Sequence, residues 1–158
     1  MGAIVGTAAP DFKNAFTDMA TNVLAGLPDT AGVHVVFGEP GTYAPDDIVS
    51  VNRVTTTQAP AAMGPKRPRE ETLELTVTIS CYRGGGEEME RVCSDRAYAL
   101  LRILADQVHH VDTTLGGVVR LCFLTDTDSD GATDPATLAE GRAIAVKATF
   151  TAQARVTN

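Results

Sequence analysis

The chain has 158 residues, a length that suits one compact domain and is too short for two large ones. Apolar residues make up 44% of it and charged residues 21%, so it has the composition of a folded chain with a hydrophobic core. Thirteen basic and twenty acidic residues give a formal net charge of -7, which argues against a broad basic face for nucleic acid. We expect a single domain over residues 1–158, with its core in about 11–157.

The amino-terminal residues and the three cysteines bear on where the chain works. The opening MGAIVGTAAP has neither a basic leader nor a long apolar stretch, so we expect no secretory signal and no membrane span. Cys81, Cys93 and Cys122 are widely spaced, form no C-x-x-C pair and lie in apolar patterns. We therefore expect three buried, reduced thiols in a protein made in a cytoplasm.

The first third of the chain predicts a helix, two short strands and an arm. Asp11 is a candidate helix cap, because apolar residues recur after it at helical spacing. Residues 33–37 and 48–54 are β-rich runs separated by a Gly-Glu-Pro-Gly turn signal. Residues 55–69 hold three prolines and three basic residues, which predicts an exposed, mobile arm and disfavours a paired strand.

The remaining elements are predicted from clearer periodicity. Residues 72–83 alternate apolar and polar side chains, which indicates a long strand with one wet face. Residues 87–111 carry an apolar stripe at helical spacing. Two closing strands, 117–125 and 142–156, flank an exposed acidic loop at 126–141. The predicted fold class is α+β, a mostly antiparallel sheet of about five strands packed by two helices.

The sharpest local motif is Asp126-Thr-Asp128-Ser-Asp130-Gly131, which matches the first half of an EF-hand loop. Its second half fails, because the twelfth position is Thr137 where the motif requires a Glu, and strands flank the loop. Asp126, Asp128 and Asp130 are thus a weak candidate for Ca²⁺. We favour a solvated turn and no cofactor.

Other constellations give no catalytic site. The glycines at 84–86 precede a helix, but the acidic residues that follow oppose a bound phosphate and no G-K-[ST] follows. His109 and His110 are adjacent on a helix and do not converge, so we interpret them as helix-end residues. No nucleophile elbow is present. We expect the chain not to be an enzyme.

Two oppositely charged segments are candidates for contacts between subunits. Lys66, Arg67 and Arg69 lie among prolines, and Asp128, Asp130 and Asp134 lie in the acidic segment. A solvated arm and a contact arm are both compatible with the basic residues. In the second case the arm meets the acidic segment of a neighbouring copy, as head-to-tail packing in a ring allows.

The order of elements and three segments resemble the tail-terminator and head-to-tail connector proteins of long-tailed phages. The segments are LELTVTISCYRGGG at 73–86, RVCSDRAYALLRIL at 91–104 and DTTLGG at 112–117. The resemblance covers about residues 12–156 and carries no catalytic residue. It implies a virion subunit in the tail or neck, assembled in the host cytoplasm.

In such a protein a homo-oligomeric ring, commonly a hexamer, caps the last disc of the tail tube protein. Its other face meets the neck and head-completion proteins, and DNA passes through the lumen without specific binding. Two alternatives remain. A neck connector or minor tail protein shares nearly all these features, and a small Ca²⁺-dependent binding domain or enzyme requires an ion at Asp126, Asp128 and Asp130.

Overall fold

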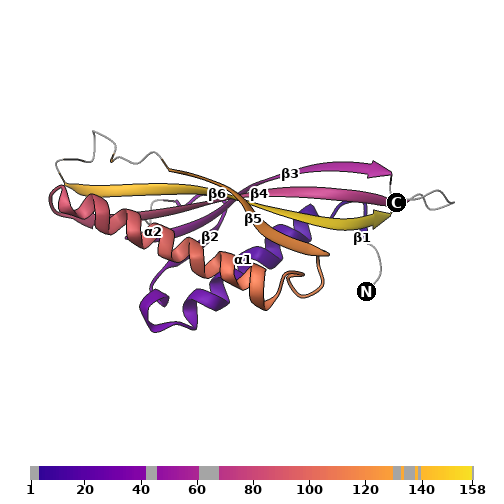
Figure 1. Ribbon diagram of the computed structural model, residues 1–158, viewed down its shortest axis with the longest axis horizontal. Helices are drawn as coiled ribbons and strands as arrows, with labels where there is room; N and C mark the ends of the chain where they lie inside the picture. The colour runs from indigo at the N-terminus through magenta and orange to yellow at the C-terminus, as the bar shows by residue number, and fades with distance from the viewer. Residues whose placement is uncertain are drawn as a thin grey trace.

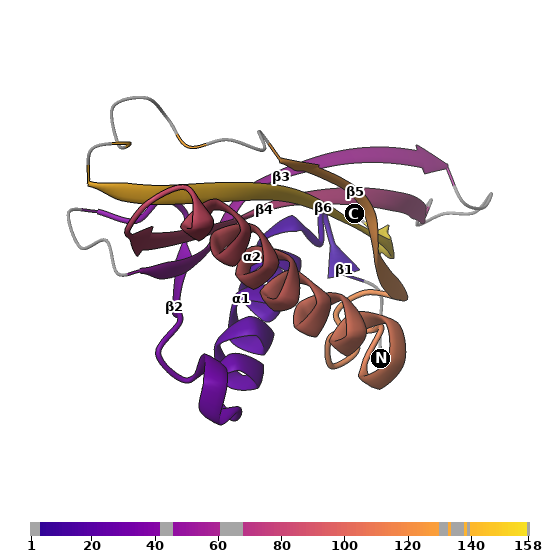
Figure 2. The same cartoon turned by 60° about the vertical axis from the view of Figure 1, so that its left-hand side comes forward.

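The computed structural model describes residues 4–41, 46–60, 68–129, 133, 138 and 140–157. Over these residues the chain is an α+β fold, in which one mixed, mostly antiparallel sheet is covered on one side by two helices (Figures 1 and 2). The fold class predicted from the sequence is confirmed.

The sheet of the described residues has the order β2-β3-β4-β6, and the outer edge of β6 pairs with both β5 and the short β1. The β2–β3 and β1–β6 pairs are parallel, and the other pairs are antiparallel. The strands are β1 (Ile4–Val5), β2 (His34–Phe37), β3 (Asp47–Pro60), β4 (Arg69–Gly84), β5 (Leu121–Ser129) and β6 (Gly141–Thr157).

The two central strands, β4 and β6, pair along their whole length, from Arg69↔Val156 to Gly84↔Gly141. Odd-numbered residues of β4 and even-numbered residues of β6 are buried beneath the helices, because successive side chains point to opposite faces of a sheet. The strands predicted at 72–83 and 142–156 are therefore confirmed, and each extends slightly further.

Helix α1 (Ala9–Ala25) packs against β2 and β3 through the buried side chains that its helical spacing predicts. Phe16 also reaches Phe150 on β6, with ring centroids 4.8 Å apart. The expected cap at Asp11 is wrong. The cap residue is Ala8, whose backbone N–H is bound by the Glu71 carboxylate from β4, and Asp11 lies in the first turn. A short 3-10 turn, η1 (Pro28–Thr30), follows α1.

Helix α2 (Glu88–Asp106) packs on β4 and β6 and ends in a single π-helical turn, η2 (Gln107–Val111). Together they confirm the helix predicted at 87–111. Val108 of η2 is buried, so the apolar stripe continues through the change in winding.

Two expected loops are corrected by the structure. Residues 55–60 are not an arm. They form the end of β3 and pair with residues 69–74 of β4. Their side chains are exposed, and Pro60 is tolerated because it is the last residue of an edge strand. Residues 126–129 belong to β5, which begins at Leu121 and not at 117, and residue 141 begins β6.

Candidate assembly surface

The sheet face opposite the helices is polar and is left open by α1 and α2 (Figure 2). Its centre is a group of half-buried hydroxyl side chains on adjacent strands, where Thr76 lies opposite Thr149 in the register of β4 and β6. Exposed charges such as Glu74 and Lys147 surround them. Cross-strand threonine pairs stabilise such a face without an apolar cover.

One edge of the sheet is formed by β3, and only half of it is covered. Strand β2 pairs with residues 48–51 of β3, and Gly38 donates its backbone N–H to the Val51 carbonyl. A β-bulge between Val51 and Val54 then separates this half from the rest of β3. Among the described residues, no strand pairs with the outer side of residues 54–60. We call residues 54–60 the open half of β3.

The opposite edge, formed by β5, is also half covered. The Thr113 hydroxyl binds both the N–H and the C=O of Cys122, and His109 Nε2 accepts the N–H of Leu124 at 3.0 Å. A β-bulge between Leu124 and Asp126 follows. No strand within the described part of the chain pairs with the outer side of residues 126–128. We call these residues the open half of β5.

The acidic candidates are placed on β5. Asp126 and Asp128 are exposed and two residues apart on a strand, opposite Thr149 and Lys147 of β6. An EF-hand loop needs its early ligands on a tight turn that wraps the ion, and extended backbone does not supply this. The described residues hold no group of three or more metal-binding side chains. Asp130 and Asp134 lie outside the described residues.

The basic candidates are separated by the structure. Arg69 is the first residue of β4, is half-buried, and directs Nη2 to the Gly6 carbonyl at 3.4 Å. It therefore belongs to the sheet and not to an arm, because its backbone pairs with Pro60 and Val156. Lys66 and Arg67 lie outside the described residues.

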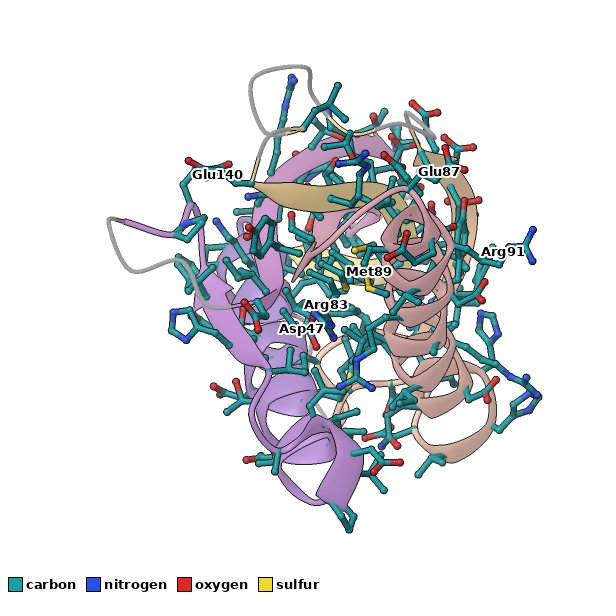
Figure 3. The ribbon with its side chains drawn as sticks, turned by 90° about the vertical axis from the view of Figure 1, so that its left-hand side faces the viewer. Asp47, Arg83, Glu87, Met89, Arg91 and Glu140 are labelled. Carbon is teal, nitrogen blue, oxygen red and sulfur yellow. The ribbon has the colours of Figure 1, made fainter. Side chains whose placement is uncertain are left out.

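A cluster of charged side chains that was not predicted from the sequence joins the sheet to α2. Asp47 on β3 accepts hydrogen bonds from Arg83 on β4 at 2.7 Å and from Arg96 on α2 at 3.0 Å. The Asp47 and Arg83 side chains point toward one another (Figure 3). Burial alone would raise the pKa of Asp47, but the hydrogen bonds from the two arginines outweigh it and lower this pKa. Because both arginines are satisfied within the fold, the cluster holds the structure together.

The turn into α2 carries negative charge, as the sequence predicts. Glu87, Glu88 and Arg91 line a shallow hollow there, and Figure 3 shows Arg91 pointing outward from α2. The Glu88 carboxylate lies beside Gly86, 2.9 Å from where a Cβ would be. A carboxylate at this helix end favours the interpretation as a strand-to-helix turn over a phosphate site.

The cysteines are buried, as predicted, and none is in a disulfide. Burial raises the pKa of Cys81 and of Cys122 to about 12 and also raises the pKa of Cys93. Thiols with such values are poor nucleophiles at neutral pH.

No protein-family model matches the sequence, and no curated protein matches it significantly. In the part of the chain that the structure describes, no helix is both long and apolar enough to cross a membrane.

Proposed function

We propose that this protein is a structural subunit of a long-tailed phage virion, a tail terminator. Six copies form a ring on the last disc of the tail tube, stop tube growth and present the opposite face to the neck. The proposal rests on the resemblance of residues 73–117 to such proteins and on the architecture of the sheet.

The observation that carries the proposal is that the sheet ends in two half-covered edges. An exposed strand edge is a template for another chain, and monomeric proteins usually protect it with charges, bulges or a covering segment. Here such devices cover one half of each edge: β2 on β3, and Thr113 with His109 on β5. Two different open edges on one subunit suit a heterologous, head-to-tail contact, which closes into a ring when the rotation allows.

The charge of the chain is compatible with a subunit that DNA passes. A formal net charge of -7 disfavours retention of DNA, whose binding depends largely on neutralising phosphates with Lys and Arg. A continuous core of buried apolar side chains joins α1 and α2 to one face of the sheet, as a rigid subunit requires.

The proposal is tested by mass and by position. We expect the purified protein to give a particle of about six chains by light scattering. Added to polymerising tube subunits of the same virus, it should shorten the tubes and appear at one tube end by immunogold labelling.

A monomer at all concentrations, together with unchanged tube lengths, rejects the proposal. Labelling one layer nearer the capsid, with no effect on tube length, assigns the protein to the neck connector class.

A further inference from the structure

We propose that the open half of β3 in one copy pairs, antiparallel, with the open half of β5 in the next copy. One continuous sheet then runs around the ring. This inference deepens the proposed function and rests on it for ring closure, but the strand contact is tested separately. The partner is a second copy of this chain.

The backbone of β3 presents unpaired groups on its outer side. The Val51 carbonyl points away from β4, because it accepts the Gly38 N–H. Val51 lies opposite Val77 and, after the bulge, Val54 lies opposite Leu75. Alternation from this point directs the N–H and C=O of Val54, Thr56 and Gln58 outward.

The backbone of β5 follows the same rule. The N–H of Cys122 and of Leu124 points outward, to Thr113 and His109. Leu124 lies opposite Phe150 and, after its bulge, Thr127 lies opposite Ala148. The N–H and C=O of Thr127 therefore point outward at the centre of the open half, where a neighbouring strand can bind them.

The side chains of the two edges also match in their faces. Thr56 lies opposite Leu73, and Thr127 lies opposite Ala148, so both project to the helix-covered face. Pairing Thr56 with Thr127 places Thr57 opposite Asp126 on the open face. A threonine hydroxyl can donate to a carboxylate across such a pair.

The two open halves lie at opposite ends of the sheet, which selects a staggered contact. Thr56 reaches Ala152 of β6 through Leu73, whereas Thr127 reaches Ala148, four residues away along β6. Copies set level would oppose each open half to a covered half. A four-residue stagger over the four strands β3, β4, β6 and β5 corresponds to a strand tilt of about 35°, at the lower end of the range of closed β-barrels.

Strand direction and charge favour this pairing over self-pairing. Strand β5 runs opposite to β3 within one chain, and rotation about the ring axis preserves direction, so the contact is antiparallel. Two β5 edges would bring Asp126 and Asp128 of both copies together. Residues 54–59 of β3 are uncharged, and the exposed Arg53 lies within diagonal reach of Asp128 in the staggered register.

Disulfide trapping tests the contact. Two double variants, Thr57→Cys with Asp126→Cys and Thr57→Cys with Asp128→Cys, are oxidised and separated without reductant. We expect a ladder of linked species that ends at the ring size in one of them or in both. The native cysteines are buried and give no background, and the two single variants of each pair should not link.

Three outcomes contradict the inference. Linking of Thr57→Cys alone indicates β3 self-pairing. A ring by light scattering without links in either double variant overturns the contact and leaves the ring intact. A monomer without links rejects both proposals. A ladder that continues beyond any closed size supports the strand contact and rejects the closed ring of the proposed function.

A pair of proline variants supplies a second test. In Thr56→Pro the lost N–H points outward, so the monomer should keep its circular dichroism spectrum while the assembled fraction falls at least tenfold. In Thr55→Pro the lost N–H points to β4, so the monomer itself should be destabilised. Full assembly of a folded Thr56→Pro protein overturns the inference.

Discussion

The carboxylate of Glu71 on β4 accepts the backbone N–H of Ala8 at 2.6 Å, although 63 residues separate the two in the chain. Its other oxygen accepts the Thr7 hydroxyl at 2.6 Å and the Gln58 amide at 2.7 Å. The Glu71 side chain is fully buried. A carboxylate from the sheet thus caps α1 and offers negative charge to its positive end, which fixes the helix over the sheet.

Replacement of Glu71 by Ala should lower the free energy of unfolding by about 2–4 kcal/mol, because it leaves donors without an acceptor in the interior. Urea denaturation followed by circular dichroism measures the loss. The control is Glu74→Ala on the exposed face of the same strand, which we expect to change stability by less than about 0.5 kcal/mol. Equal losses in the two variants would contradict the capping role.

The burial of Glu71 could be predicted from the sequence, but its hydrogen-bond partners could not. Residues 73–81 alternate so regularly that the same period, extended back by one step, puts Glu71 on the buried face of β4. Its partners Thr7 and Ala8 were not predictable, because no local pattern shows which end of α1 meets which strand. The sequence indicated Asp11 as the cap because aspartate is a common capping residue, but Asp11 lies in the first turn of the helix.

Acid should remove the stabilisation that Asp47 gives to the fold. The pKa of Asp47 lies below its ordinary value of 3.8, since hydrogen bonds from Arg83 and Arg96 outweigh the effect of burial. Its contribution is therefore complete above about pH 4, near the unfolded pKa, and is lost as pH falls through the folded pKa.

Thermal unfolding of the wild type and of Asp47→Asn between pH 2 and pH 7 measures this contribution. We expect the variant to melt lower at pH 7 and the difference to shrink below about pH 4. The control for loss of one negative charge is Asp128→Asn, at an exposed position on β5. A difference that stays constant down to pH 2 would show that the two arginines do not depend on ionised Asp47.

The long elements were predictable because each buries one continuous face. Strand β6 and helix α2 show the periods of two and 3.6 that such faces require. The parallel direction of the β2–β3 pair was not predicted, because the sequence of a short strand does not show which way its neighbour runs. Strand β1 was not predicted because two residues are too few to show a periodic pattern. The open half of β3 was missed because Thr, Gln, Ala and Pro residues without an apolar face are typical of loops.

Burial should protect all three cysteines from alkylation. The pKa of Cys81 and of Cys122 is raised to about 12 by burial, so at pH 8 only about one thiol in ten thousand is ionised. We expect iodoacetamide to leave the native protein unmodified and to add three groups in urea, as mass spectrometry can count. Rapid modification of one thiol in the native protein would reveal local opening at that strand or helix.

Gly141, the first residue of β6, has no room for a side chain. A Cβ there would lie 2.5 Å from the Arg83 carbonyl oxygen and 2.8 Å from the Tyr82 hydroxyl. The Tyr82 hydroxyl donates to the Glu140 carbonyl at 3.1 Å, so the ring crosses the strand end at this point. The need for glycine at this position was not predictable from the sequence, because the atoms that crowd it belong to β4, about 60 residues earlier in the chain.

Gly141→Ala should therefore lower the free energy of unfolding by about 1–3 kcal/mol, since the backbones of β4 and β6 must move apart. Urea denaturation measures the loss, with Gly32→Ala as the matched control, because a Cβ at Gly32 meets nothing within 4 Å. Adding Tyr82→Ala removes the ring but not the Arg83 carbonyl, so this second change should not restore stability. Full recovery in the double variant would assign the strain to the ring alone.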